Sequence, residues 1–260
     1  MIEVSHIYKS FEDKEVLKDI SAVFENGKTN LIIGQSGSGK TVLLSTIVGL
    51  HDPTSGKIFY DNVDFCTLKK KEQILLRREM GMLFQNAALF DSLTVLENVM
   101  FPLNMFSNAT AIERERRAKE CIGRVNLSGA EHKLPSEISG GMQKRAAIAR
   151  AIALKPKYLF CDEPNSGLDP KTSIVIDELI HGITTELDIT TIVNTHDMNS
   201  VMGIGDKILY ICEGRAEWQG TSADIMRSDN KRLNDFIFAS DILRKYKEVE
   251  EEKVKNQKIS

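Results

Sequence analysis

The chain has 260 residues, of which 42% are hydrophobic, so it can bury a full core as one large domain or as one domain with an inserted subdomain. Its 34 Lys and Arg residues nearly balance its 37 Asp and Glu residues, which argues against a protein built mainly to neutralise nucleic-acid phosphates. The start, MIEVSHIYKS, has no basic segment before an apolar run and no apolar stretch is long enough to cross a bilayer, so we expect a soluble, cytoplasmic chain.

Residues 34–41 read GQSGSGKT and fit the phosphate-loop pattern G-x-x-x-x-G-K-[ST]. Before them, KTNLIIG predicts a buried strand, and after them KTVLLSTIVGL predicts a helix that ends near Gly49. In the order strand, loop, helix, backbone N–H groups from about Ser36 to Thr41 would converge on phosphate oxygens at a helix N-terminus. The alternative for this stretch is a flexible turn of Gly and Ser.

The side chains of the loop predict a nucleoside triphosphate, ATP, with Mg²⁺ as its occupant. Lys40 would reach the β- and γ-phosphates, and the Thr41 hydroxyl would bind Mg²⁺. Larger side chains at the glycines would block the approach of phosphate to the backbone. The residues that we expect to contact the nucleotide here are Gly34, Ser36, Gly37, Ser38, Gly39, Lys40, Thr41 and Val42.

Two segments between residues 86 and 139 have helical character. NAALFDSLTVLENVMFPLNMF is followed by NATAIERERRAKECIGRVNL, which has a cap, a helical period and an acid-then-basic charge pattern. Further along, Ser139, Gly140 and Gly141 precede an Ala-, Arg- and Ile-rich stretch with strong helix propensity. They therefore predict a second bare helix N-terminus that suits an anion.

The next segment, KYLFCDEP at residues 157–164, predicts an apolar strand that ends in two adjacent carboxylates. Asp162 would hold the water shell of Mg²⁺, and Glu163 would accept a proton from an attacking water molecule. An Asp-Glu pair could instead be a solvated turn. Ligands of open α/β sheets bind at the carboxyl ends of strands, so the presence of a phosphate loop favours the catalytic interpretation of this pair.

The order of these motifs resembles that of the ATP-binding subunits of ABC transporters: phosphate loop, glutamine in LFQ, Ser-Gly-Gly before a helix, acidic strand, histidine in NTHD. The resemblance covers roughly residues 1–225. It implies an α/β P-loop fold with a mixed sheet, an N-terminal antiparallel β region and an inserted helical subdomain. The expected parts are an ATP-binding core in residues 1–85 and 140–225, the helical subdomain in residues 86–139, and a C-terminal helical extension with a charged tail in residues 226–260.

The resemblance also implies roles for single residues. Ser139, Gly140 and Gly141 match the signature motif, which would bind the γ-phosphate held by a second copy in a head-to-tail, ATP-dependent dimer. Gln85 matches a glutamine that contacts Mg²⁺ and the attacking water and that moves together with the membrane partner. His196 matches a histidine that contacts the γ-phosphate, although a lone histidine is usually structural.

Two further matches keep an alternative beside them. Asp169 resembles the aspartate that links the two active sites of the dimer, and it also predicts a helix N-cap followed by Pro170. Phe11 stands where the family stacks an aromatic ring on adenine, with a core or surface role as the alternative. Met142 and Asn165 depart from the commonest residues, glutamine and threonine, and we expect them to affect only the rate and the contacts to the ribose.

The stretch GMLFQNAALFDSLTVLENVMFPL, together with SGGM, is similar to the ATPases of Mla-type lipid transporters, which work with a multi-spanning permease and an MCE-domain protein. This implies an ATPase that powers phospholipid transport from the cytoplasmic face of the inner membrane. The permease would dock near Gln85 and residues 86–103. Leu89, Phe90, Phe101 and Leu103 are the candidate apolar contacts, with core packing as the alternative.

Two other functions stay open at this point. One is the import of a small solute such as an amino acid. The other is a soluble ABC-type ATPase in DNA repair or translation, although we expect no nucleic-acid partner because the chain has no basic surplus. The charged residues 241–260 would form either a solvated tail or an extension that reaches across the dimer.

Overall fold

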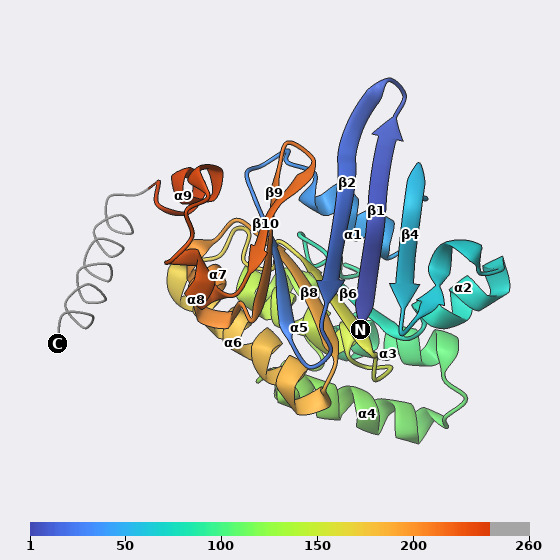
Figure 1. The fold of residues 1–260 in the computed structure, drawn as a ribbon. Coiled ribbons are helices and arrows are strands. Elements are labelled where there is room, and N and C mark those ends of the chain that lie inside the picture. The colour runs from blue at the N-terminus through green and yellow to red at the C-terminus, as the bar shows by residue number, and fades with distance from the viewer. Residues whose placement is uncertain (240–260) are drawn as a thin grey trace.

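In the computed structural model, which describes residues 1–239, two β-sheets and the helices between and beside them build the fold (Figure 1). The strands are β1 Ile2–Phe11, β2 Lys14–Phe24, β3 Thr29–Ile33, β4 Ser55–Tyr60, β5 Val63–Asp64, β6 Met80–Leu83, β7 Tyr158–Asp162, β8 Thr190–Thr195, β9 Lys207–Cys212 and β10 Arg215–Gly220. The α-helices are α1 Lys40–Ile47, α2 Lys70–Arg77, α3 Val95–Phe106, α4 Ala111–Arg124, α5 Gly140–Ala151, α6 Pro170–Leu187, α7 Met198–Ile204, α8 Ser222–Ile225 and α9 Lys231–Ile237. The predicted tail at residues 241–260 lies outside the described residues.

The smaller sheet is antiparallel and has the strand order β2-β1-β4-β5. In the first strand, IEVSHIYKSF, Ile2 and Val4 are buried and Glu3 lies between them on the other face, while an irregular register after Val4 returns Ile7 to the buried face. Such alternation is typical of an antiparallel sheet with one face on the core. This sheet is the N-terminal antiparallel region that the sequence predicts.

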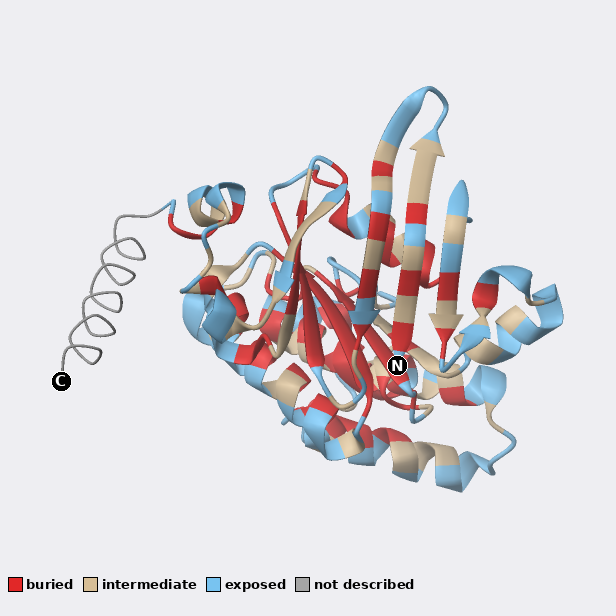
Figure 2. Ribbon diagram, in the orientation of Figure 1, coloured by how far each residue is buried: buried red, intermediate tan, exposed pale blue. Residues whose placement is uncertain are grey.

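The larger sheet has the strand order β10-β9-β3-β8-β7-β6, and all its neighbouring strands are parallel except the pair β9 and β10. Every residue of β3, β7 and β8 is buried, as expected for parallel strands covered on both faces (Figure 2). The predicted mixed α/β fold is therefore confirmed. Because β3, β7 and β8 run in the same direction, the residues that follow them lie at one edge of the sheet.

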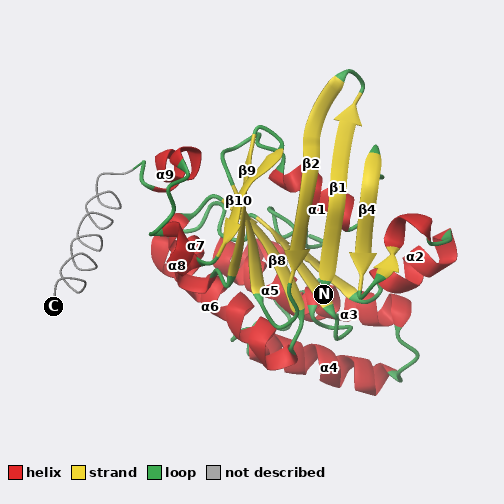
Figure 3. Ribbon diagram, viewed as in Figure 1, coloured by secondary structure: helices red, strands yellow, loops and turns green. Residues whose placement is uncertain are grey.

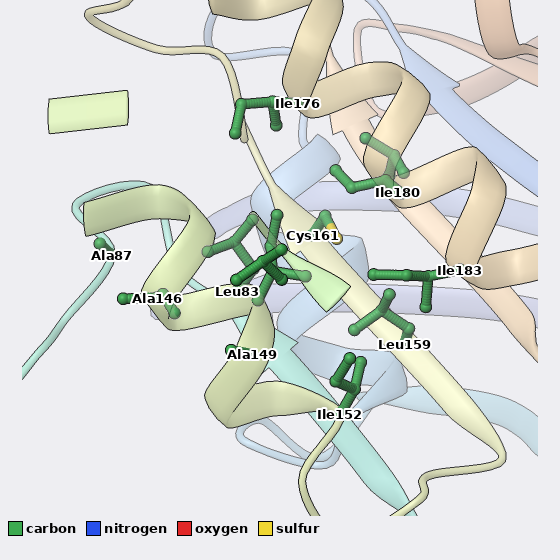
Figure 4. Close-up of a cluster of buried hydrophobic side chains, with 14 of the residues drawn as sticks. Leu83, Ala87, Ala146, Ala149, Ile152, Leu159, Cys161, Ile176, Ile180 and Ile183 are labelled. Atoms are coloured by element: carbon green, nitrogen blue, oxygen red, sulfur yellow. The ribbon is translucent and has the colours of Figure 1, made fainter. Parts of the chain in front are cut away.

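Successive residues of the central strands point into two different cores. Leu159 and Cys161 of β7 join a cluster that includes Ile152 near the end of α5 and Ile180 of α6 (Figure 4). Phe160, between them, belongs to the second cluster, which lies between the two sheets and includes the apolar side chains of α1. The large sheet is thus fixed from both sides, and the ends of its strands have defined positions.

The helical segments predicted between residues 86 and 139 correspond to α3 and α4. Thr110 caps α4, because its hydroxyl accepts a hydrogen bond from the Glu113 N–H at 3.3 Å. Both helices lie with α5 and α6 beside the large sheet (Figure 3). Their buried side chains share one cluster with those of α5, so a separate subdomain with the boundaries 86–139 stays a prediction.

The remaining local predictions also correspond to observed elements. The strand before the phosphate loop is β3, and the helix after it, α1, ends two residues before Gly49. Near the C-terminus, β10 forms a hairpin with β9, and the two short helices α8 and α9 follow it. Among residues 1–239, no helix combines the length and the apolar character needed to span a membrane.

Candidate active site

The phosphate loop, the end of β7 and the end of β8 meet around an open cavity of about 600 Å³. Its walls come from residues far apart in the sequence, which the parallel strands β3, β8 and β7 bring to one edge of the sheet. The lining residues are Val16, Gln35, Ser36, Gly37, Gly39, Lys40, Thr41, Val42, Gln85, Glu163, His196 and Phe236. Many of the residues predicted to bind ATP therefore do lie together.

The loop itself needs glycine at two positions where the chain passes close to other atoms. A Cβ on Gly34 would lie 2.3 Å from the carbonyl oxygen of Ile211, and one on Gly39 would lie 2.9 Å from Leu17 Cδ2. Gly39 also has φ +108°, a conformation that other residues rarely adopt. The backbone N–H groups of Ser36, Gly37 and Gly39 donate to no acceptor within residues 1–239. Free N–H groups at the start of α1 suit phosphate oxygens.

The ammonium group of Lys40 is buried and lies beneath this loop. Its Nζ donates hydrogen bonds to the carbonyl oxygens of Gly34 at 2.9 Å and Gln35 at 3.1 Å, and it lies 3.8 Å from Glu163 Oε1. Burial lowers the pKa of Lys40, and the negative charges of Glu163 and Asp162 partly oppose this shift. A triphosphate would give the ammonium group a stronger anionic partner.

The carboxylate of Asp162 has two hydrogen-bond donors. Thr41 Oγ1 donates to Asp162 Oδ1 at 3.2 Å, and Asn194 Nδ2 donates to the same oxygen at 3.0 Å. A hydroxyl and a carboxylate side by side suit Mg²⁺, which prefers oxygen ligands and keeps several waters and substrate phosphates. The third expected metal ligand, Gln85, lines the cavity, but its Nε2 donates to Ser166 Oγ at 3.3 Å. Its contact with Mg²⁺ stays a prediction.

Glu163 and His196 form a close side-chain contact in the cavity. The Nδ1 atom of His196 lies 2.7 Å from Glu163 Oε2, and a carboxylate can only accept, so the proton of this bond is on Nδ1. Glu163 has φ +49°, in the left-handed region that non-glycine residues seldom occupy. Such backbone strain is common at functional sites. The residue predicted to be the general base is thus held at an unusual bend at the end of β7.

The predicted signature residues lie outside this cavity. Ser139 caps α5, because its hydroxyl accepts a hydrogen bond from the Met142 N–H at 3.3 Å. A Cβ on Gly141 would lie 2.5 Å from Thr172 Cγ2, so a larger residue here would displace the Thr172 side chain where α5 meets α6. None of Ser139, Gly140 and Gly141 lines the cavity that holds the phosphate loop. Within one chain they cannot complete that site.

Asp169 has the capping role that its sequence predicts. It accepts hydrogen bonds from Thr172 N at 3.0 Å and from Thr172 Oγ1 at 2.5 Å, at the start of α6. These hydrogen bonds keep the pKa of the Asp169 carboxyl below its ordinary value. A role in linking two active sites stays a prediction, compatible with the cap.

Phe11 stands at the end of β1 but does not line the cavity. Its ring contacts that of His51 edge-on, with 5.1 Å between the centroids, and Lys9 Nζ lies 4.8 Å from its centre. Adenine stacking by Phe11 stays a prediction that requires the ring to face the cavity.

Three residues at or beside the cavity, Val16, Phe236 and Lys144, were not predicted from the sequence. Val16 and Phe236 provide apolar walls of the cavity, and Phe236 comes from α9, where it stacks on Tyr210 with 5.3 Å between ring centroids. Lys144 of α5 is buried and donates hydrogen bonds to the carbonyl oxygens of Gln85 and Glu163. Lys144 therefore connects α5, the helix that Ser139 caps, with the two loops that flank the cavity.

The four candidate partner contacts divide into two pairs. Phe90 and Phe101 are exposed, have ring centroids 4.6 Å apart and line an apolar groove of about 310 Å³ with Phe84 and Phe106. Leu103 is buried in the core and Leu89 packs against it, so for these two the alternative of core packing is correct. The docking prediction therefore depends on the two phenylalanines.

Asn165 does not line the cavity: its side chain is buried and donates to Asp177 on α6 and Ser200 on α7. Its expected effect on the rate and on the ribose contacts stays a prediction. Met142 is partly buried and packs against the main core.

Comparison with known proteins identifies the family. The family model described as ABC transporter matches residues 17–166. Over 237 residues the chain is 36% identical to the intermembrane phospholipid transport system ATP-binding protein MlaF of Haemophilus influenzae, covering 91% of this chain and 90% of MlaF. It is 34% identical over 236 residues to the "Probable ribonucleotide transport ATP-binding protein mkl" of Mycobacterium tuberculosis, covering 91% of this chain and 66% of that protein. The chain thus spans just under two thirds of the mycobacterial relative.

A solved structure supports the same assignment. The dimeric, post-hydrolysis state of the ATP-binding cassette MJ0796 bound to ADP and Pi matches with a TM-score of 0.77 and 34% identity. The match covers 85% of this chain and 99% of that one, so most of the fold is shared with that cassette.

Proposed function

The chain belongs to the ABC transporter family, and from this premise we propose that it is the ATP-hydrolysing subunit of a transporter that moves phospholipid across or between bacterial envelope membranes. The observation that carries the enzymatic part is the arrangement of Lys40, Asp162 and Glu163. A cation for phosphate and a carboxylate for water line one cavity, and the carboxylate for the metal accepts a hydrogen bond from Thr41, which lines the same cavity.

In this proposal the triphosphate of ATP lies along the loop at the start of α1. The free N–H groups of Ser36, Gly37 and Gly39 and the ammonium group of Lys40 would bind its oxygens. Thr41, Gln85 and, through water, Asp162 would hold Mg²⁺. Bound Mg²⁺ neutralises charge that develops on the phosphate oxygens.

Glu163 would act as the general base. Its carboxylate takes a proton from water as the water oxygen bonds to the γ-phosphorus and the bond from phosphorus to the ADP oxygen breaks. His196, at hydrogen-bond distance from Glu163, would orient the carboxylate and contact the γ-phosphate. The products are ADP and phosphate, the ligands in the related MJ0796 structure.

A second copy of the chain would complete each site. The residues Ser139, Gly140 and Gly141 lie outside the cavity of their own chain, and the related cassette is described as a dimer. We therefore propose a head-to-tail dimer in which each chain places these residues on the nucleotide held by the other. Asp169, near the same surface, would link the two sites.

The cargo and the membrane partner are inferred from MlaF and from the groove near Phe90 and Phe101. MlaF is described as part of an intermembrane phospholipid transport system, and the match with this chain covers 90% of MlaF. A multi-spanning permease would place an apolar helix in the groove, and an MCE-domain protein would carry the lipid. The subunit would then work on the cytoplasmic face of the inner membrane.

The test is a mild-detergent purification of the tagged protein from its native membranes, with copurifying proteins and lipids identified by mass spectrometry. A multi-spanning permease together with an MCE-domain protein and phospholipid would support the proposal. A permease with a solute-binding protein would replace the cargo while keeping the ATPase. Copurification of nucleic acid or ribosomes without a permease would contradict a transport function.

A further inference from the structure

A buried polar cluster connects the segments that follow Glu163 and His196 in the sequence, and the proposed mechanism does not use it. Asn165 Nδ2 donates to Asp177 Oδ1 at 2.8 Å and lies 3.1 Å from Ser200 Oγ, and Ser200 Oγ donates to Asp177 Oδ2 at 2.7 Å. Asn165, Asp177 and Ser200 are 9%, 5% and 0% exposed. Each of the two carboxylate oxygens therefore has its own donor.

The three residues come from one loop and two different helices. Asn165 follows Glu163 by two residues in the loop after β7. Ser200 follows His196 by four residues and lies in α7, while Asp177 lies in α6. One carboxylate thus connects the segment that carries the general base with the segment that carries the histidine.

The chemistry of the cluster makes this connection specific. Within residues 1–239, Asp177 has no Lys, Arg or His at ion-pair distance. Burial raises the pKa of the Asp177 carboxyl, and the hydrogen bonds from Ser200 and Asn165 lower it in turn. A buried carboxylate is costly without its hydrogen bonds, so a movement of either segment away from Asp177 is strongly opposed.

We infer that Asp177 is a positioning residue for ATP hydrolysis, which holds the segments of Glu163 and His196 at the separation needed for catalysis. The inference rests on the proposed function, because it assumes that Glu163 activates water. Asp177 touches neither the nucleotide cavity nor Glu163 itself. Its effect would pass through Asn165 on one side and Ser200 on the other.

The first test is Asp177→Ala, measured as kcat and KM for ATP. We expect kcat to fall at least tenfold and KM to change less than about twofold, because misplacement of a catalytic group affects the chemical step more than binding. In Asp177→Asn, kcat should fall less than about threefold, because the new amide can still accept a hydrogen bond from Asn165 and donate one to the Ser200 oxygen. An unchanged kcat in Asp177→Ala would overturn the inference.

A matched control comes from the same helix. Thr184 of α6 is fully buried, and its hydroxyl lies 2.6 Å from that of Thr191 on β8. Thr184→Val removes a buried hydrogen bond between α6 and β8 away from the cavity, so it should lower the melting temperature without changing kcat. If Thr184→Val lowered kcat as much as Asp177→Ala, general loss of packing would explain both.

A double-variant cycle separates positioning from stability. If Asp177 acts through the pair of Glu163 and His196, the fold-loss of kcat in the double variant Asp177→Ala, His196→Ala should be smaller than the product of the fold-losses in the two single variants. Independent effects that multiply would overturn the inference. If Asp177→Ala does not fold, Ser200→Ala removes one of the two donors with a smaller change in volume, and the same cycle applies.

The failure of this inference differs from the failure of the proposed function. Normal turnover in Glu163→Gln would reject the hydrolysis mechanism. Loss of turnover in Glu163→Gln with normal kcat in Asp177→Ala would reject only the role of Asp177.

Discussion

The Nδ1 atom of His196 lies 2.7 Å from Oε2 of Glu163, so the residue that follows β8 contacts the residue that follows β7. The contact arises from the sheet, because β7 and β8 are parallel neighbours with Asp162 paired to Asn194. Residues beyond the paired ends must therefore approach each other. Strand pairing thus holds the proposed base, Glu163, beside its proposed orienting group, His196.

The first prediction concerns the role of Glu163 as a base. Glu163→Gln should bind ATP with an affinity close to that of the unchanged protein and hydrolyse it at least about a hundredfold more slowly, because the amide cannot take a proton from water. Phosphate release measures turnover, and a fluorescent ATP analogue measures binding. Glu79→Gln is the control, since Glu79 pairs with Lys157 away from the cavity and should leave both quantities unchanged.

A second prediction follows from the lowered pKa of Lys40. Only the charged ammonium group attracts the triphosphate, so bound ATP raises the pKa of this lysine above its value in the free protein. The Kd for ATP should therefore rise with pH once the pH passes the lowered pKa of free Lys40, below the ordinary range of a lysine. Above that point the increase approaches tenfold per pH unit.

Binding of ATP measured between neutral and alkaline pH tests this. Lys40→Arg keeps its charge throughout, so its Kd should stay level where that of the unchanged protein rises. An equal rise in both proteins would assign the effect to another group.

The motifs of the site were predictable because each is local in the sequence. The strand, loop and helix around Lys40 and the strand that ends in Asp162 and Glu163 appear where their patterns place them. His196 was identified only through the family resemblance, because a single histidine does not form a recognisable motif with a fixed spacing. Its contact with Glu163 depends on the order of the strands in the sheet.

The contacts that were missed depend on tertiary packing. Phe236 reaches the cavity because α9 packs where its ring stacks on Tyr210, and no pattern in the short C-terminal helix predicts this. No sequence pattern distinguishes Lys144 from other helical lysines, yet it lies buried against two carbonyl groups. Asn165 was interpreted from its family position, but its partners Asp177 and Ser200 lie 12 and 35 residues away.

A third prediction tests the metal site. Asp162→Asn should raise the Mg²⁺ concentration needed for half-maximal ATPase activity by about ten- to a hundredfold, as expected for a partner that acts on the metal through water. Removing Mg²⁺ with a chelator should abolish hydrolysis in both proteins. Asp235→Asn, on the exposed side of α9, is the control and should keep the original Mg²⁺ dependence. An unchanged Mg²⁺ requirement in Asp162→Asn would remove this residue from the metal site.

The last prediction concerns the groove formed by Phe90 and Phe101. A charge placed there would have to be buried under an apolar partner helix, which is costly, so Phe101→Asp should lose copurification of the permease. The ATPase activity of the isolated subunit should stay within about twofold, because Phe101 does not line the nucleotide cavity.

Met105→Asp provides the matched control for this variant. Met105 is on the same helix and 60% exposed, but it does not line the groove. It should therefore keep the permease, since its charge stays in water when the partner docks. Loss of the permease in both variants would indicate that the whole exposed surface of α3 makes the contact. Retention in both would exclude the groove as the docking site, and would leave the exposed phenylalanines without a partner.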